Sequence, residues 1–341
     1  MPTLDERGLR ERLRTSSTGC FLLFGEETYL TKTYVNKIID TVVEPAFADF
    51  NLHRFDGKSA SLSDIYDAAI AVPMMAEHTC VLVLDYPLEE ADDEELRALE
   101  RLLKETPEDC ALVFAYQTVQ PKGAKFNAAV RLFDWLGCVV KFARREQAEL
   151  VRLAENGAKK RGCAFDRGAA LYFVTNVGTD LNLLLNELEK VCAYSDGTIS
   201  RAEIDAVCVK SLEARVFDMI RDLNAGRLEG ALRKLSQLFA QREDPLMILG
   251  ALAASYTDLY RVKAAVTCGE RPDAAADNYN YAKKEFRLRN AAPHASALSL
   301  PVLYECLELL AQADAELKGF GGNDRLVLEQ TLVQLARAAG R

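Results

Sequence analysis

Residues 25–32 lie where a phosphate-binding loop is expected, because they follow a strongly apolar segment and precede a helical pattern. A working loop reads G-x-x-x-x-G-K-[ST], in which backbone amides and the lysine surround phosphate oxygens. Counting from Gly25, this chain has Leu30 in place of the second glycine, and then Thr31 and Lys32 in place of the Lys-Ser/Thr pair. The Cβ of Leu30 obstructs the sharp turn that such a loop requires. We therefore expect a degenerate loop without a nucleotide-binding site.

Asp85 follows another apolar segment, where a nucleotide hydrolase places the acid that holds Mg²⁺. That chemistry favours a second acid beside the first, but Tyr86 and Pro87 follow, so we interpret Asp85 as a strand-ending aspartate. The nine cysteines form no C-x-x-C pair, and the three histidines are far apart in the sequence. Neither pattern is typical of a metal site or a catalytic triad. We expect no catalytic residue, no metal and no cofactor.

The elements that position these residues alternate between strand and helix up to residue 143. Short β-branched and aromatic strands separated by helices predict a parallel sheet that is covered on both faces. The predicted strands are residues 20–24, 51–55, 79–84, 110–116 and 137–142. The predicted helices are residues 27–40, 62–72, 91–106 and 123–136.

The pattern after residue 143 predicts helices only. Residues 144–212 are typical of a small helical domain, with Asp180 as a helix N-cap and Ser200 and Glu203 as a capping box. Residues 213–341 contain longer amphipathic helices and form a further helical domain. The predicted fold class is α/β plus all-α.

The net charge of −9 belongs to residues 1–143, which contain 15 Lys and Arg against 24 Asp and Glu. A domain with this charge is a poor non-specific binder of nucleic acid, because phosphate affinity comes mainly from Lys and Arg. The sequence contains no long apolar run and no N-terminal signal pattern. We therefore expect a cytoplasmic protein with no membrane partner.

Six stretches spread over nearly the whole chain carry a family resemblance. They are residues 21–27 (FLLFGEE), 50–57 (FNLHRFDG), 72–77 (VPMMAE), 178–190 (GTDLNLLLNELEK), 216–218 (VFD) and 314–318 (DAELK). In this order and spacing they resemble AAA+ clamp-loader subunits, and within that group the delta subunits of bacterial DNA polymerase III.

The resemblance implies three domains. They are an AAA+-like, clamp-binding domain with a degenerate P-loop over residues 1–143, a small helical lid over 144–212 and a C-terminal helical collar for oligomerisation over 213–341. In that family the subunit is the arm of a five-subunit loader that opens the clamp, while sibling subunits bind and hydrolyse ATP. The resemblance thus implies a non-catalytic subunit of the DNA-directed DNA polymerase (nucleotidyltransferase) holoenzyme that acts in DNA replication. The implied partners are the ring-shaped sliding clamp (beta subunit), the tau/gamma and delta-prime subunits in a hetero-pentamer, and primed DNA through the assembled complex.

Met74 and Met75 are the candidate clamp-binding residues. Periodicity alone favours the interpretation that both methionines cap the local core. The resemblance instead implies an exposed hydrophobic pair that inserts into a pocket of the clamp, with Pro73 fixing the entry to it through its restricted φ. The usual pair is similar to leucine-phenylalanine, so two methionines depart from it; they are adaptable side chains but lack a rigid aromatic anchor.

Phe320 lies in a glycine-rich stretch between the last two predicted helices. An aromatic side chain there either plugs the core or offers a stacking surface to a nucleic-acid base. The resemblance places an aromatic residue close to this position, near the primer–template junction.

A divergent P-loop-type NTPase with an unconventional nucleotide site is the alternative function. The missing lysine and second glycine argue against it.

Overall fold

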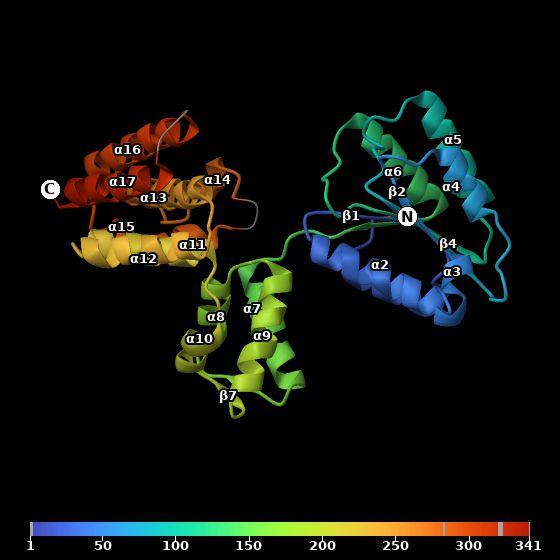
Figure 1. Cartoon of the computed structure of the whole chain (residues 1–341), viewed down its shortest axis with the longest axis horizontal. Helices are drawn as coiled ribbons and strands as arrows, with labels where there is room; N and C mark the ends of the chain where they lie inside the picture. The colour runs from blue at the N-terminus through green and yellow to red at the C-terminus, as the bar shows by residue number, and fades with distance from the viewer. Residues whose placement is uncertain (1–2, 282–283, 320–322, 341) are drawn as a thin grey trace. The chain divides into compact units, whose positions relative to one another are not determined.

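The structure is a computed structural model that describes residues 3–281, 284–319 and 323–340. The chain divides into two compact units, residues 1–144 and 145–341. Each unit is described by itself below, with the element labels of Figure 1. Among the described residues, no helix combines the length and the apolar character needed to cross a membrane.

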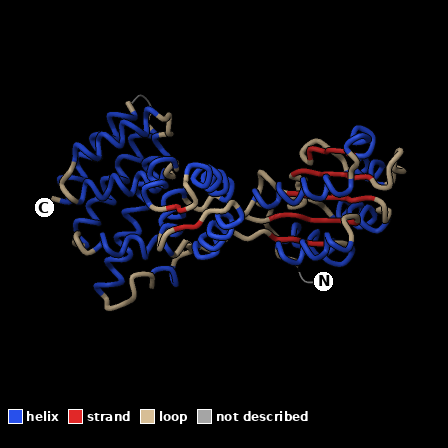
Figure 2. The backbone as a smooth tube through the Cα atoms, turned by 90° about the horizontal axis from the view of Figure 1, so that it is seen from below, coloured by secondary structure: helices blue, strands red, loops and turns tan. Residues whose placement is uncertain are grey.

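A five-stranded parallel sheet forms the centre of the first unit, and its strands lie side by side in Figure 2. The strand order is β2-β3-β4-β1-β5, so β1 pairs with both β4 and β5. The strands are β1 (Gly19–Phe24), β2 (Leu52–Asp56), β3 (Thr79–Leu84), β4 (Cys110–Ala115) and β5 (Cys138–Lys141). All five predicted strands are present, with ends that differ by at most one residue.

Helices cover both faces of this sheet (Figure 1). Successive side chains of a strand point to opposite faces, so Cys20 and Leu22 share one core with three helices, whereas Phe21 and Leu23 face the side on which α2 packs. Helix α2 (Thr28–Val42) lies on that second face. Helices α4 (Leu62–Ala69), α5 (Asp93–Glu105) and α6 (Ala124–Leu136) lie on the first.

The predicted helix over residues 62–72 is too long, since α4 ends at Ala69 and Ile70 is its C-cap. The sequence explains this difference because a residue before proline is disfavoured in the helical region, and Pro73 follows closely. Its start is confirmed, because Ser61 and Asp64 form a capping box.

Three short elements of the first unit were not predicted. They are α1 (Glu6–Thr15), the 3₁₀ turn η1 (Pro45–Phe47) and α3 (Ala48–Asn51). Leu9 is the buried residue of α1, whose other side chains are largely polar or charged, so the apolar periodicity is weak. Just before α1, Leu4 bridges to Val140 of β5.

The second unit consists mainly of helices. They are α7 (Gln147–Lys160), α8 (Ala169–Val177), α9 (Leu181–Tyr194), α10 (Arg201–Val207), α11 (Leu212–Asn224), α12 (Leu228–Ala240), α13 (Pro245–Thr267), α14 (Ala275–Asn278), α15 (Phe286–Ala295), α16 (Leu300–Lys318) and α17 (Asp324–Ala339). The predicted caps are confirmed: Asp180 accepts a hydrogen bond from the Leu183 amide, and Ser200 forms a capping box with Glu203.

The prediction that only helices follow residue 143 is wrong. Two-residue strands β6 (Ala164–Phe165) and β7 (Thr198–Ile199) pair in parallel. Each follows a glycine with positive φ, Gly162 at +77° and Gly197 at +94°, which turns the chain into the short strand. Strands of two residues are too short to produce a detectable alternation of apolar and polar side chains.

Helices α11 to α17 enclose the larger apolar core of the second unit. Two buried aspartates lie among these helices. Asp222 accepts hydrogen bonds from Arg227 and Lys234, and Asp258 accepts one from the Tyr281 hydroxyl and pairs with Arg287. Buried carboxylates need such partners, because an unpaired buried charge is strongly destabilising.

Candidate functional site

The turn after β1 is closed by the protein itself. Gly25 adopts φ +133°, and a Cβ at this position would lie 2.2 Å from the Phe142 carbonyl oxygen. The Glu27 amide donates to that same oxygen at 3.1 Å, and the Gly25 carbonyl accepts from Gln120 Nε2 at 2.7 Å. The Glu27 amide and the Gly25 carbonyl are therefore engaged within the fold.

The residues at the lysine and second-glycine positions are also part of the fold. Leu30 and Thr31 are buried on α2, and both of their amides donate to the Glu27 carbonyl oxygen. Lys32 is exposed on the next helical position. The Leu30 and Thr31 amides are therefore not free to bind a phosphate group.

Asp85 connects the ends of two neighbouring strands. Its carboxylate is buried and accepts hydrogen bonds from the Gln117 amide at 2.8 Å and from the Thr118 hydroxyl at 2.7 Å. Its own amide donates to Ala115, and its φ is +52°. These contacts support the interpretation of Asp85 as a strand-ending aspartate, because they occupy both carboxylate oxygens.

Thiol chemistry at the sheet is suppressed by burial. Burial raises the pKa of Cys20 and Cys110 to about 11 and that of Cys80 to about 12. Since the thiolate is the reactive form, these side chains act as packed apolar groups. Among the described residues, no three His, Cys, Asp or Glu side chains lie together so that they could hold a metal ion.

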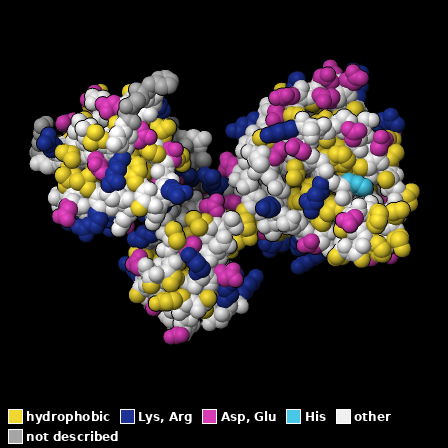
Figure 3. Space-filling model, viewed as in Figure 1, with side chains coloured by type: hydrophobic (Ala, Val, Ile, Leu, Met, Phe, Trp, Pro, Cys, Tyr) yellow, Lys and Arg dark blue, Asp and Glu magenta, His cyan; other side chains and the backbone are white. Residues whose placement is uncertain are grey.

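The loop between α4 and β3 exposes several apolar side chains. Met74 is 55% exposed, Met75 is 77% exposed and Val72 is 87% exposed. Ile70 at the end of α4 and Phe50 on α3 are exposed as well. Hydrophobic side chains gather over α3 and this loop in Figure 3. We call these five residues the apolar loop patch; an exposed group of this kind marks a protein-binding surface more often than a catalytic site.

Asn51 holds this loop from the end of α3. The Met74 amide donates to Asn51 Oδ1 at 2.7 Å, and Asn51 Nδ2 donates to the Met74 carbonyl at 2.9 Å. Asn51 Nδ2 also donates to the Phe47 carbonyl at 3.1 Å. The asparagine side chain is buried, so these bonds fix the backbone of Met74 while its side chain extends to solvent.

Met75 has a backbone conformation that few non-glycine residues adopt, with φ +56°. The interpretation that both methionines cap the core is therefore not supported, because both side chains lie outside it. Pro73 is half-buried directly before the pair. The sequence singled out the methionines and the proline but missed Asn51, whose contact spans 23 positions. Phe320 lies outside the described residues.

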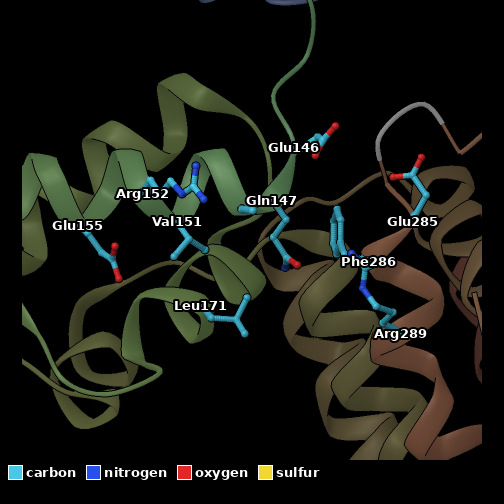
Figure 4. A pocket seen from close by; sticks show the side chains of 10 residues that line it. Glu146, Gln147, Val151, Arg152, Glu155, Leu171, Glu285, Phe286 and Arg289 are labelled. Atoms are coloured by element: carbon cyan, nitrogen blue, oxygen red, sulfur yellow. The ribbon is translucent and has the colours of Figure 1, made fainter.

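A separate cavity of about 440 Å³ lies within the second unit. Figure 4 shows its lining on α7, α8 and the start of α15. Three carboxylates (Glu146, Glu155 and Glu285) and two guanidinium groups (Arg152 and Arg289) surround apolar side chains such as Phe286. This mixture lacks the excess of positive charge that the phosphates of a nucleotide require.

A parallel α/β unit with a glycine turn after its first strand, followed by a helical unit, defines the class as an α/β protein with an added helical region. A family model described as "DNA polymerase III, delta subunit" matches residues 21–143. A second, described as "DNA polymerase III delta subunit, C-terminal domain", matches residues 213–335. The chain belongs to the family of DNA polymerase III delta subunits, which confirms the expected family.

Individual relatives agree with this assignment. DNA polymerase III subunit delta of Bacillus subtilis (strain 168) is 25% identical over 327 residues, which cover 93% of this chain and 92% of the relative. The solved structure of the Bacillus subtilis DNA clamp loader delta protein aligns with a TM-score of 0.61 at 24% identity, covering 97% of this chain and 99% of the other. That likeness confirms the predicted α/β-plus-helical fold class.

A more distant likeness involves the RuvB Holliday junction branch migration motor of Thermotoga maritima. It is 9% identical over 63% of this chain and 75% of the motor, with a TM-score of 0.38. A score this low supports no conclusion about this chain.

Proposed function

We propose that this chain is a clamp-loader subunit that binds the ring-shaped sliding clamp and opens it for loading onto primed DNA. The observation that carries the proposal is the exposed pair Met74 and Met75, presented on a backbone that Asn51 fixes. Family membership and the printed name of the solved relative, a DNA clamp loader delta protein, support the same function.

Binding opens the ring if the subunit has a higher affinity for the open clamp than for the closed one. Two methionine side chains that become buried in a clamp pocket contribute roughly 1.5 to 3 kcal/mol each. Methionine has three rotatable bonds and a polarizable sulfur, so the pair can fit an irregular pocket without an aromatic anchor. Pro73 restricts the backbone that leads into the pair.

The same proposal makes this subunit non-catalytic. The engaged amides of Glu27, Leu30 and Thr31 and the engaged carboxylate of Asp85 support this part. ATP binding and hydrolysis then belong to sibling subunits of a cytoplasmic hetero-pentamer whose other members are the tau/gamma and delta-prime subunits. We assign residues 144–212 to a small helical lid and residues 213–341 to a collar that joins these subunits.

A double substitution tests the clamp site. Met74→Ala/Met75→Ala should weaken binding of the full chain to the sliding clamp at least about 100-fold, since roughly 3 kcal/mol or more of apolar burial is removed. Calorimetry or surface plasmon resonance measures this change. The matched control is Leu246→Ala/Met247→Ala, which truncates another exposed apolar pair, at the start of α13, and should leave clamp affinity unchanged. A folded Met74→Ala/Met75→Ala variant with normal affinity would exclude these residues as the clamp site.

Equilibrium binding of labelled ATP to the full chain tests the second part. We expect no measurable affinity. Micromolar binding would favour the divergent NTPase instead.

A further inference from the structure

The methionines of this chain differ sharply in exposure. Met219 is completely buried in the core of the second unit, whereas Met74, Met75 and Met247 are 55%, 77% and 62% exposed. Two of these three exposed thioethers are adjacent and lie in the apolar loop patch. Any oxidant in solution reaches them without opening the fold.

We propose that Met74 and Met75 form a reversible oxidation site whose conversion to methionine sulfoxide switches off clamp binding. The inference rests on the proposed function, because it concerns the same side chains. In the reaction a peroxide transfers one oxygen atom to the thioether sulfur: an S–O bond forms, the O–O bond breaks, sulfur loses two electrons and the peroxide leaves as water or an alcohol.

Oxidation changes the polarity of the methionine pair. A sulfoxide is polar and chiral, whereas the thioether is apolar and adapts to its pocket. A clamp pocket that accepts a hydrophobic pair must then take up two unpaired S–O dipoles, and burying a polar group without a partner is unfavourable. We expect the affinity of the doubly oxidised chain for the clamp to fall at least about tenfold.

The scaffold should survive this oxidation. The loop is held by backbone groups of Met74 that bond to Asn51, and neither bond involves a sulfur atom. Both side chains lie outside the core, so the oxygen atoms add no volume to packed regions. The change is therefore confined to the binding surface, and enzymes that reduce methionine sulfoxide can reverse it.

The test treats the full chain with hydrogen peroxide, locates sulfoxides by mass spectrometry and measures binding to the sliding clamp before and after. Each protein is compared with its own unoxidised form. The wild type should lose affinity at least about tenfold. It should regain it after methionine sulfoxide reductases A and B with a dithiol as their reductant, but not after the dithiol alone, which reduces cysteine disulfides and sulfenic acids and leaves sulfoxides intact. Met74→Leu/Met75→Leu has no sulfur at these positions and should keep its affinity through peroxide. The control Met247→Leu should lose affinity as the wild type does.

Protection gives an independent readout. Pre-bound clamp should slow oxidation of Met74 and Met75 but not of Met247. Full affinity of a chain whose Met74 and Met75 are both sulfoxides would overturn the inference, and so would equal sensitivity of the Met74→Leu/Met75→Leu variant. If the unoxidised chain does not bind the clamp, or if Met74→Ala/Met75→Ala binds normally, the proposed function fails first. Failure of the proposed function is thus seen in unoxidised samples, whereas failure of the oxidation proposal is seen in oxidised ones.

Discussion

Asn51 and Met74 are joined by two hydrogen bonds in opposite directions, between one side-chain amide and the two peptide groups of a single residue. Two residues on neighbouring antiparallel strands exchange the same pair of hydrogen bonds between their peptide groups; here the side-chain amide of Asn51 takes the place of one peptide group. The buried asparagine thereby fixes the backbone of the loop between α4 and β3 in the way that a neighbouring strand would.

Asn51→Ala removes both bonds, so the backbone of Met74 loses its fixed position. We expect the free energy of unfolding to fall by about 1 to 3 kcal/mol, because partly buried peptide groups lose their partners. Clamp affinity should fall about tenfold, since the methionine pair must then be ordered during binding. Urea unfolding and surface plasmon resonance measure the two effects. The control is Asn176→Ala, which also removes a buried asparagine that donates to a carbonyl, at Tyr172, and should cost stability without changing clamp affinity.

Met75→Asn should separate stability from binding. A left-handed backbone costs an ordinary residue about 1 to 2 kcal/mol, and asparagine tolerates it better. Thermal unfolding should therefore show equal or slightly higher stability, while clamp affinity falls about tenfold because the apolar side chain is lost. Met75→Val is the counterpart: it keeps an apolar side chain but disfavours positive φ, so it should lower the melting temperature. A Met75→Asn variant of normal affinity would contradict the assigned role.

Gly25→Ala should destabilise the first unit by about 3 kcal/mol or more, because the new Cβ meets the Phe142 backbone and φ is strained. The strain alone is measured by Gly123→Ala, since Gly123 has φ +104° and no atom within 4 Å of the added Cβ. That control should cost only about 1 to 2 kcal/mol. If urea unfolding showed the same loss of stability for Gly25→Ala and Gly123→Ala, the contact with Phe142 would contribute nothing to the destabilisation.

Asp222 makes the stability of the second unit depend on acid pH. The hydrogen bond from Lys234 holds the pKa of this carboxyl below its ordinary value of 3.8, burial opposes that shift, and Arg227 reinforces it. Because the pKa is lowered in the folded state, its contribution is complete above about pH 5 and is lost as pH falls below 3.8 toward the folded pKa.

Asp222→Asn should therefore cost about 1 to 3 kcal/mol at pH 7, and the difference from the wild type should shrink below pH 4. Denaturant unfolding from about pH 2.5 to about pH 7 measures this difference. Asp314→Asn removes the carboxylate of an exposed pair with Lys318 and should change stability by at most about 0.5 kcal/mol. A pH-independent difference for Asp222→Asn would contradict the assigned cause.

Local patterns were enough to predict the sheet and most helices. The strand around Cys110 is a continuous run of buried residues, as a covered parallel strand requires, and the Ser200–Glu203 capping box marks a helix start by residue type and spacing alone. The methionine pair was also found, although its exposure came from the family resemblance and not from the residues.

Contacts between distant segments could not be predicted in this way. Asparagine is common in turns, and no local pattern around Asn51 predicts a contact with Met74, which is 23 positions away. The pairing of β6 with β7 depends equally on two segments more than 30 residues apart. The closed turn at Gly25 is an intermediate case: the altered loop residues predicted a degenerate loop, but not that the Phe142 carbonyl would accept a hydrogen bond from the Glu27 amide.

The closed turn also determines where the chain leaves the first unit. Phe142 precedes the unit boundary by two residues; its amide donates to Phe24, its carbonyl accepts from Glu27, and its ring stacks on Tyr34 at 5.5 Å. These contacts anchor the start of the connection to residue 145 by means of this unit's own atoms. The position at which the chain leaves the first unit is therefore fixed by backbone hydrogen bonds and a ring contact within that unit.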